Sequence, residues 1–284
     1  MYKIEKENLE ALFRKIAESQ DLILPVKKAG QTNFGLWNEE EEADLDTLKT
    51  VKSGKDAFFP QSETLYTVVR DGKKLTVEPE ELRNRPFVVF GMKACDVKGV
   101  AVLDKVFLAD PVDTFYAARR DHGTIVAMAC HEPEESCFCK VFGTDAADPS
   151  ADADGVADIA VWMVQDSLYW KALTEKGEAL TEAVKELLTD ADASDEEKVS
   201  AEKDAIHNIV EQLPYTHLSL EGWGGDKLEE KFNSPKWEEL YKPCLACGTC
   251  TFVCPTCQCY DIKDFNTGNG VQRYRCWDSC MYSD

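Results

Sequence analysis

The sequence predicts an α/β domain with a mixed sheet, followed by a short cysteine-rich module. Two continuous apolar runs, at 87–90 and 124–129, have the pattern of strands buried on both faces. A helical pattern at 96–108 lies between them, so the three segments predict a βαβ unit. The module is indicated by the cysteines, because eight of the twelve fall in the last 41 residues.

Each remaining element of the α/β domain is predicted from its own local pattern. Leu9, Leu12, Phe13 and Ile16 recur at helical spacing, which indicates an amphipathic first helix. A polar stretch between two apolar runs indicates a hairpin near 165–167. In chain order the predicted elements are a helix over 7–19, a strand over 21–26, a loop over 145–158, a hairpin of 159–164 with 168–170, and helices over 178–189 and 195–213.

The composition divides the chain into three parts. The last predicted helix ends before Pro214, and the glycines around Trp223 break any regular pattern. We therefore predict an α/β domain over 1–213, a linker over 214–243 and the cysteine-rich module over 244–284.

The charge of the chain excludes several classes of partner. Thirty-two Lys and Arg against fifty-three Asp and Glu give a net charge of −21, which disfavours binding to nucleic acid or to anionic lipid. No apolar run is long enough to span a bilayer, and the first residues lack the apolar stretch of a signal peptide. We expect a cytoplasmic protein, in which reduced cysteines bind metal more readily than they form disulfides.

One cysteine motif carries recognisable chemistry. The spacing Cys244-x2-Cys247-x2-Cys250-x3-Cys254, followed by Pro255, is that of bacterial ferredoxins. Cysteines three residues apart in a tight loop can direct thiolates to neighbouring corners of a [4Fe-4S] cluster. Zinc is the alternative, although zinc sites favour two separated cysteine pairs. The module is therefore predicted to be ferredoxin-like and to bind a [4Fe-4S] cluster.

The ligand set of this module is left open by the sequence. In two-cluster ferredoxins the fourth cysteine of such a run ligates the other cluster, and no second run is present here. Either Cys254 completes its own cluster, or other cysteines contribute, or part of the module is absent from this chain. The other candidates, which are also plausible as small buried hydrophobic residues, are Cys257, Cys259, Cys276 and Cys280.

A second group of cysteines is predicted in the α/β domain. Cys95 and Cys130 each follow one of the two buried strands, and Cys137 and Cys139 lie in the next loop. The carboxyl ends of parallel strands meet at one edge of a sheet, so these four thiols are expected to converge there. They are candidate ligands of a further cluster, with a purely structural role as the alternative. The chain thus has cysteines for one cluster, and for two or three if the further groups contribute.

An ordered set of motifs over residues 55–284 resembles a known family. The motifs are FFPQSE at 58–63, GMKACD at 91–96, CHEP at 130–133 with CFC at 137–139, the ferredoxin run, and WDSC at 277–280. In this order they are similar to the beta subunit of cytosolic nickel–iron hydrogenases of the sulfhydrogenase type. The iron–sulfur components of anaerobic sulfite reductase, and of flavin oxidoreductases that work with heterodisulfide reductase, are also similar.

The resemblance implies an electron-transfer subunit rather than a catalytic subunit, with no catalytic residue of its own. It implies partners, namely a flavin-containing NAD(P)H subunit and a catalytic oxidoreductase subunit. Two alternatives remain open: a stand-alone reductase with substrate or flavin at the N-terminal cysteine site, and a zinc-binding scaffold. Family members usually continue into a second ferredoxin run, which this sequence lacks.

Overall fold

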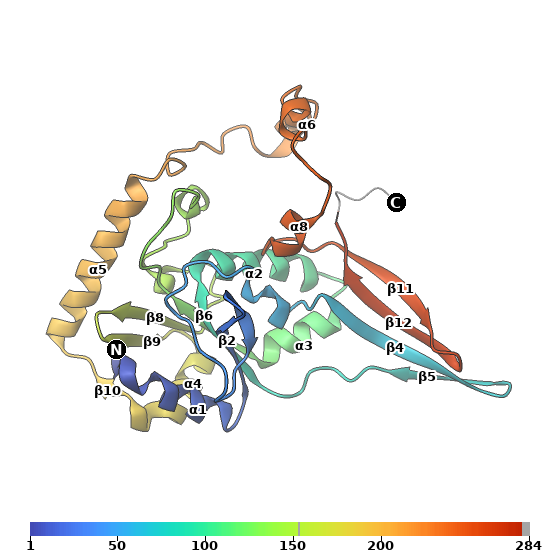
Figure 1. The fold of residues 1–284 in the computed structure, drawn as a ribbon, viewed down its shortest axis with the longest axis horizontal. Coiled ribbons are helices and arrows are strands. Elements are labelled where there is room, and N and C mark those ends of the chain that lie inside the picture. Colours follow the sequence, from blue (N-terminus) through green and yellow to red (C-terminus); the bar gives the residue numbers. More distant parts are fainter. Residues whose placement is uncertain (153, 280–284) are drawn as a thin grey trace.

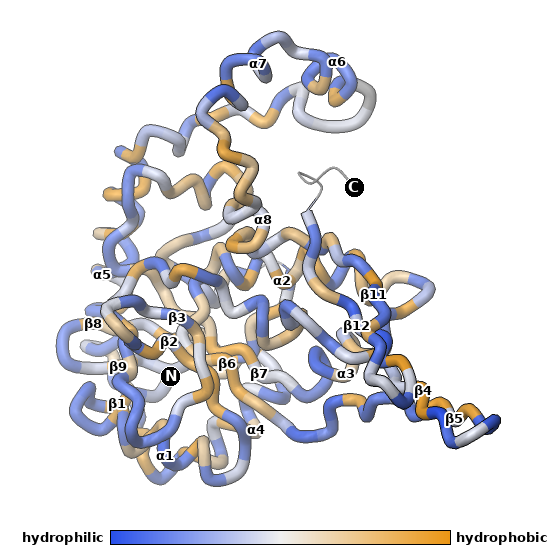
Figure 2. The backbone as a smooth tube through the Cα atoms, turned by 45° about the vertical axis from the view of Figure 1, so that its right-hand side comes forward, coloured by the Kyte–Doolittle hydropathy of each residue, from blue (hydrophilic) through white to orange (hydrophobic). Residues whose placement is uncertain are grey.

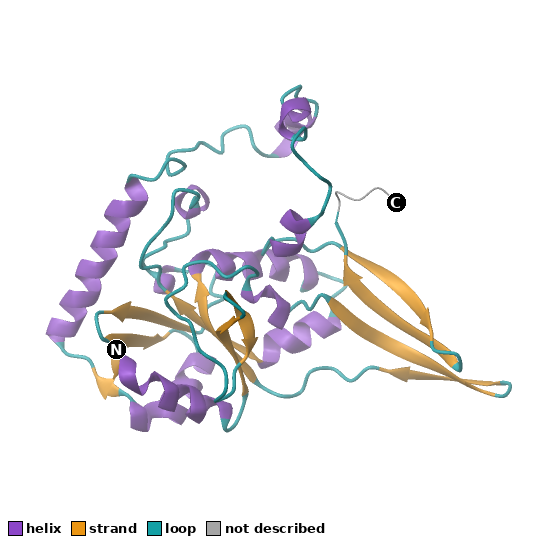
Figure 3. Ribbon diagram, in the orientation of Figure 1, coloured by secondary structure: helices purple, strands orange, loops and turns teal. Residues whose placement is uncertain are grey.

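The main body of the protein is one mixed sheet with helices on both faces (Figures 1 and 3). The computed structural model describes residues 1–152 and 154–279. In sheet order the strands are β10 (Thr189–Asp190), β1 (Tyr2–Glu5), β9 (Ser167–Ala172), β8 (Ile159–Val164), β7 (Gly123–Met128), β6 (Phe87–Lys93), β2 (Asp21–Lys28) and β3 (Gln31–Leu36). The four strands from β8 to β2 are parallel to one another, and the outer pairings are antiparallel. The predicted mixed α/β sheet is therefore confirmed.

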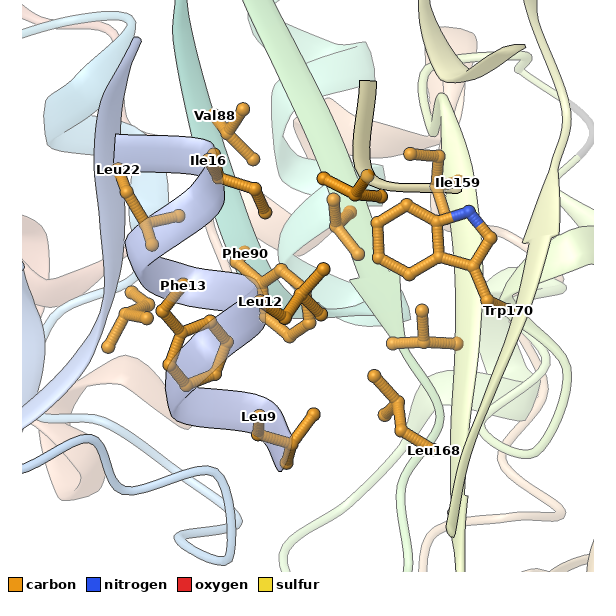
Figure 4. Packing of buried hydrophobic residues seen from close by; sticks show 14 of the residues in the cluster. Leu9, Leu12, Phe13, Ile16, Leu22, Val88, Phe90, Ile159, Leu168 and Trp170 are labelled. Carbon is orange, nitrogen blue, oxygen red and sulfur yellow. The ribbon is translucent and has the colours of Figure 1, made fainter. Parts of the chain in front are cut away.

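The two central strands are buried because helices cover both faces of the sheet. Side chains of β6 alternate: Val88 and Phe90 pack with helices α1 (Leu9–Ala17) and α4 (Glu175–Val184), as Figure 4 shows for α1. The intervening side chains of β6 pack with helices α2 (Ala94–Phe107) and α3 (Thr114–His122) on the other face. Full burial of each such side chain contributes about 1.5–3 kcal/mol. This explains why β6 and β7 read as continuous apolar runs.

Helix α5 (Ala193–Glu211) packs against the sheet near its β10 edge. Val199 of this helix packs with Trp162 and Tyr169. Asp195 is 1% exposed and accepts hydrogen bonds from Lys3 Nζ at 2.7 Å and from the Tyr169 hydroxyl at 2.9 Å. One carboxylate thereby joins α5 to β1 and β9.

A second, smaller sheet extends away from the body as a long ribbon (Figure 1). Its strands, all antiparallel, are in order β11 (Tyr260–Asn266), β12 (Gly270–Trp277), β4 (Ser62–Asp71) and β5 (Lys74–Pro79). The sequence analysis predicted none of these four strands. Their residues mix charged and apolar side chains, as expected for a ribbon exposed to solvent. A strand from the first third of the chain is thus central to the C-terminal sheet.

Buried ion pairs fasten this ribbon to the α/β domain. Arg275 of β12 is 3% exposed, and its Nε donates to Glu63 of β4 at 2.6 Å. Its Nη1 pairs with Asp113, the residue that caps α3. Glu63 also pairs with Arg119 of α3. The network joins β12, β4 and α3 at one point.

The helices differ from the prediction mainly at their ends. The predicted helix 178–189 is α4, which begins at Glu175 behind an N-cap by Thr174 and ends at Val184. The chain continues as a 3₁₀ turn and then joins the sheet as β10, because Tyr2 and Lys3 of β1 offer pairing partners. The other predicted helices agree with α1, α2 and α5 to within a few residues.

Residues 214–243 extend away from the α/β domain and include two short helices, α6 (Leu228–Phe232) and α7 (Trp237–Leu240). Figure 2 shows both helices apart from that domain. Phe232 is 81% exposed. Within residues 1–152 and 154–279, no helix is both long and apolar enough to cross a membrane.

Candidate metal centre

The ferredoxin-type run forms a loop and a short helix next to α2. Helix α8 (Thr249–Val253) carries Cys250. Ala246 and Gly248 adopt left-handed backbone angles, with φ of 54° and 69°. The chain therefore turns sharply on either side of Cys247, and glycine meets this demand at the second turn without a Cβ clash. Such turns allow closely spaced thiols to face a common centre.

The sulfur atoms of the run form local hydrogen bonds. Ala246 N–H lies 3.4 Å from Cys244 Sγ. The sulfurs of Cys247 and Cys254 lie 3.3 and 3.2 Å from the hydroxyl of the threonine two positions later. The bond from Thr249 lowers the pKa of the Cys247 thiol, which favours the thiolate. Thiolates are the form that binds iron, and such hydrogen bonds tune a cluster's potential.

A close contact places the run on α2. A Cβ atom built on Gly99 of α2 would lie only 2.8 Å from Pro255 Cβ. On the other side, Phe252 of α8 packs with Trp277 of β12, with ring centroids 6.2 Å apart. The run is thus held between a helix of the α/β domain and the last strand of the ribbon.

A buried lysine lies directly under the run. Lys55 is 3% exposed, and its Nζ donates to the carbonyl oxygens of Cys254 and Cys257 at 3.0 and 3.3 Å. The same Nζ lies 3.6 Å from the centre of the Trp277 ring. Burial lowers the pKa of Lys55, partly offset by the charges of Cys257, Asp56 and Cys254. The neighbouring carboxylate, Asp56, pairs with Lys52 instead.

The charge of Lys55 shows whether the residues around the run fit an anionic cluster. In the described part of the chain, no carboxylate forms an ion pair with Lys55. A buried cation without an anion is costly. A [4Fe-4S] cluster with four thiolates is an anion, so the residues present fit the group that the cysteine spacing predicts.

The remaining C-terminal cysteines are distributed around the run. Cys257 and Cys259 are half-buried and follow it closely, and Cys276 lies in β12 opposite Asp261. Cys280 lies outside the described residues. Among the residues that the structure describes, no three Cys, His, Asp or Glu side chains converge on a point that could hold a metal ion. The assignment of particular ligands therefore stays a prediction.

The N-terminal cysteines lie where the topology requires, at the carboxyl edge of β6 and β7. Cys95 is the second residue of α2, and Cys130 follows β7 and is 9% exposed. Cys139 packs beside Cys130, and Cys137 Sγ lies 3.3 Å from the N–H of Glu134. The four thiols are near enough for their charges to interact. Burial raises the pKa of Cys130 to about 11, partly offset by Lys93.

A cavity of about 270 Å³ lies between the two cysteine groups. Its lining includes Lys93, Cys95 and Asp96 from the β6–α2 junction and Val253 from α8. Lys93 is 7% exposed, and its Nζ is 3.4 Å from a backbone carbonyl oxygen. Burial raises the pKa of Asp96 to about 7, against the effect of Lys93. Each cysteine group therefore has a buried lysine at its side.

Sequence reasoning missed Lys55 and Gly99 as parts of this centre. Lys55 stands in an ordinary polar segment, and only its position just before the FFPQSE motif hinted at a role. A glycine inside a predicted helix does signal close packing, and Gly99 fits that rule.

Comparison with known proteins identifies the class of this centre. Residues 243–284 match the family described as 4Fe-4S dicluster domain, which makes the C-terminal part of the chain an iron–sulfur domain that binds [4Fe-4S] clusters. The whole chain is similar to sulfhydrogenase 2 subunit beta of Pyrococcus furiosus, with 29% identity over 281 residues, covering 98% of this chain and 79% of the relative. The predicted resemblance to iron–sulfur beta subunits is thus confirmed. No solved structure matches the chain.

Proposed function

We propose that this chain is the electron-transfer subunit of a multi-subunit, hydrogenase-like oxidoreductase. It relays single electrons between a flavin subunit that oxidises NAD(P)H and a catalytic partner subunit. The observation that carries this proposal is the ferredoxin-type run lying over a buried lysine that has no carboxylate partner among the described residues. The similarity along the whole chain to a sulfhydrogenase beta subunit supports it.

In this proposal the chain's residues hold and insulate the cofactor. Cys244, Cys247, Cys250 and Cys254 ligate one cluster. When bound, a [4Fe-4S] cluster supplies reversible one-electron storage. Helix α2 and Trp277 fix the run in place, so that little reorganisation accompanies each electron.

A further cluster is proposed at the N-terminal quartet, Cys95, Cys130, Cys137 and Cys139. Cys95 and Cys130 lie beside the buried Lys93, and Cys137 and Cys139 lie near Lys49, which supports this. The roles of Cys257, Cys259, Cys276 and Cys280 are left as additional or alternative ligands.

We also propose the division into an α/β domain over 1–213, a linker over 214–243 and a ferredoxin-like module from 244. The match to a 4Fe-4S dicluster domain over 243–284 supports the last boundary. The pairing of β12 with β4 means that the module shares a sheet with the first part of the chain.

The proposal is tested by metal analysis of the anaerobically purified chain. We expect iron and acid-labile sulfide in equal amounts, with at least about four of each per chain, and an electron paramagnetic resonance (EPR) signal after reduction. A Cys247→Ser variant should lose about one cluster's worth of iron. Zinc without iron or sulfide would instead support the scaffold hypothesis and refute electron transfer.

The cavity beside Cys95 favours a second candidate, a stand-alone reductase that binds substrate or flavin there. The isolated chain would then bind flavin or oxidise NAD(P)H with an artificial acceptor. Turnover by the chain without any partner would overturn the relay.

A further inference from the structure

We propose that the buried pair of Lys55 and Trp277 sets the reduction potential of the cluster at the ferredoxin-type run, making that cluster easier to reduce. The inference rests on the proposed function, because it presupposes a cluster on Cys244, Cys247, Cys250 and Cys254.

Lys55 is positioned by the fold to act on this run. Its segment begins with Ser53, whose side chain accepts a hydrogen bond from the Lys55 backbone N–H at 3.3 Å. The ammonium then donates to the carbonyl oxygens of Cys254 and Cys257. These contacts satisfy two of its three N–H donors, and the third side of the group meets the Trp277 ring. None of these partners neutralises the charge.

Trp277 adds a second donor without an acceptor. Its Nε1 is buried, and within residues 1–152 and 154–279 it has no hydrogen-bond partner. The ring packs with Phe59, with centroids 5.9 Å apart, and with Phe252 of α8. A buried N–H without an acceptor is rare in proteins and calls for an explanation. The ring that carries this N–H thus contacts both Lys55 and Phe252 of α8, the helix that carries Cys250.

Both groups act in the same direction on the potential. Reduction transfers one electron from an external donor to the cluster; no bond is made or broken and no proton is taken up. The cluster anion gains one negative charge. A fixed cation and an N–H donor nearby stabilise the more negative state, and they do so more strongly when water is excluded. Lys55 and Trp277 therefore raise the potential.

The test is an EPR-monitored redox titration of the full chain, with dithionite as reductant. Lys55→Met keeps the length of the side chain and removes its charge. We expect the oxidised form to be favoured at least tenfold, equal to a fall in midpoint potential of about 59 mV for one electron. Trp277→Phe keeps an aromatic ring and removes the N–H, and we expect it to favour the oxidised form of the cluster several-fold, which lowers the midpoint potential. Lys28→Met is the control, because it removes an exposed lysine that pairs with Glu41 and leaves Asp56 paired with Lys52.

The outcomes separate this inference from the proposed function. Loss of one EPR signal in Cys247→Ser identifies the signal of the run; if the wild-type chain has no such signal and no iron, the proposed function fails. If the signal is present and Lys55→Met leaves its potential within twofold of wild type, the inference is overturned while the function stands. If Lys55→Met does not retain its iron, Trp277→Phe decides, and an unchanged potential there overturns the inference.

Discussion

Replacing Arg275 by methionine should make the β11–β12 hairpin open more often from the α/β domain while leaving the rest of the fold in place. Arg275 is 3% exposed and pairs with two carboxylates, Glu63 and Asp113. Methionine preserves much of the apolar contact but removes the charge, so that these carboxylates lose a buried partner.

The size of the effect follows from what each carboxylate keeps. Removing one member of a buried ion pair typically costs about 3–5 kcal/mol. Glu63 retains its pair with Arg119, and Asp113 still accepts the hydrogen bond from Tyr116 N–H at 2.9 Å. We therefore expect the low end of that range, about 3 kcal/mol. At about 1.4 kcal/mol per tenfold change, local opening of the hairpin becomes about 100-fold more frequent.

Hydrogen exchange followed by mass spectrometry measures this opening. Peptides over 260–277 should exchange about 100-fold faster in Arg275→Met, whereas peptides of β7 should keep their protection. Arg273→Met is the control, since Arg273 pairs with Asp264 on the exposed side of the same hairpin and exposed pairs contribute little. Exchange over 260–277 within threefold of wild type would show that the buried network does not hold the ribbon.

Three further predictions concern the helices and the N-terminal cysteines. Gly99→Ala should speed the release of iron to a chelator, because the new Cβ clashes with Pro255. Without that clash alanine would stabilise the helix by about 1 kcal/mol, so a variant more stable than wild type would contradict the close contact. The hydrogen bond from Lys3 holds the pKa of Asp195 below the usual range, so the Asp195 carboxylate stabilises the fold above about pH 4, and this stabilisation is lost as the pH falls toward the depressed pKa. The melting-temperature difference between wild type and Asp195→Asn should therefore shrink on acidification. A difference that stays constant down to pH 2 would refute this. Replacing Cys137 and Cys139 together by serine should remove about one cluster's worth of iron, and unchanged iron would make them structural thiols.

The α/β body was predictable because its signals are local. The run 125–129 is apolar throughout because both faces of the central sheet are covered, and Leu12 and Ile16 recur at helical spacing because α1 covers one face. The ribbon was not predictable in this way. Val68 and Val271 pair across about 200 residues, and nothing near either residue specifies the other.

The candidate metal centre, too, was predictable only where its signals are local in the sequence. The spacing from Cys244 to Cys254 carries its own chemistry, and the position of Cys95 after a buried strand follows from parallel-sheet topology. Lys55 could not be assigned, because its role depends on a contact with carbonyl oxygens some 200 positions away. A lone lysine in a polar segment has no local signature of burial.

The pairing of β4 with β12 also sets an order of events while the chain is being made. Strand β4 leaves the ribosome long before β12, and at about 5–20 residues per second the interval is roughly 10–40 s. Throughout that time the β4–β5 hairpin has an unpaired edge, which is a template for wrong association. Lys55 and helix α2 are likewise synthesised before the run. The cysteine run therefore meets segments that were synthesised before it, and iron is expected to bind only after the run has been made.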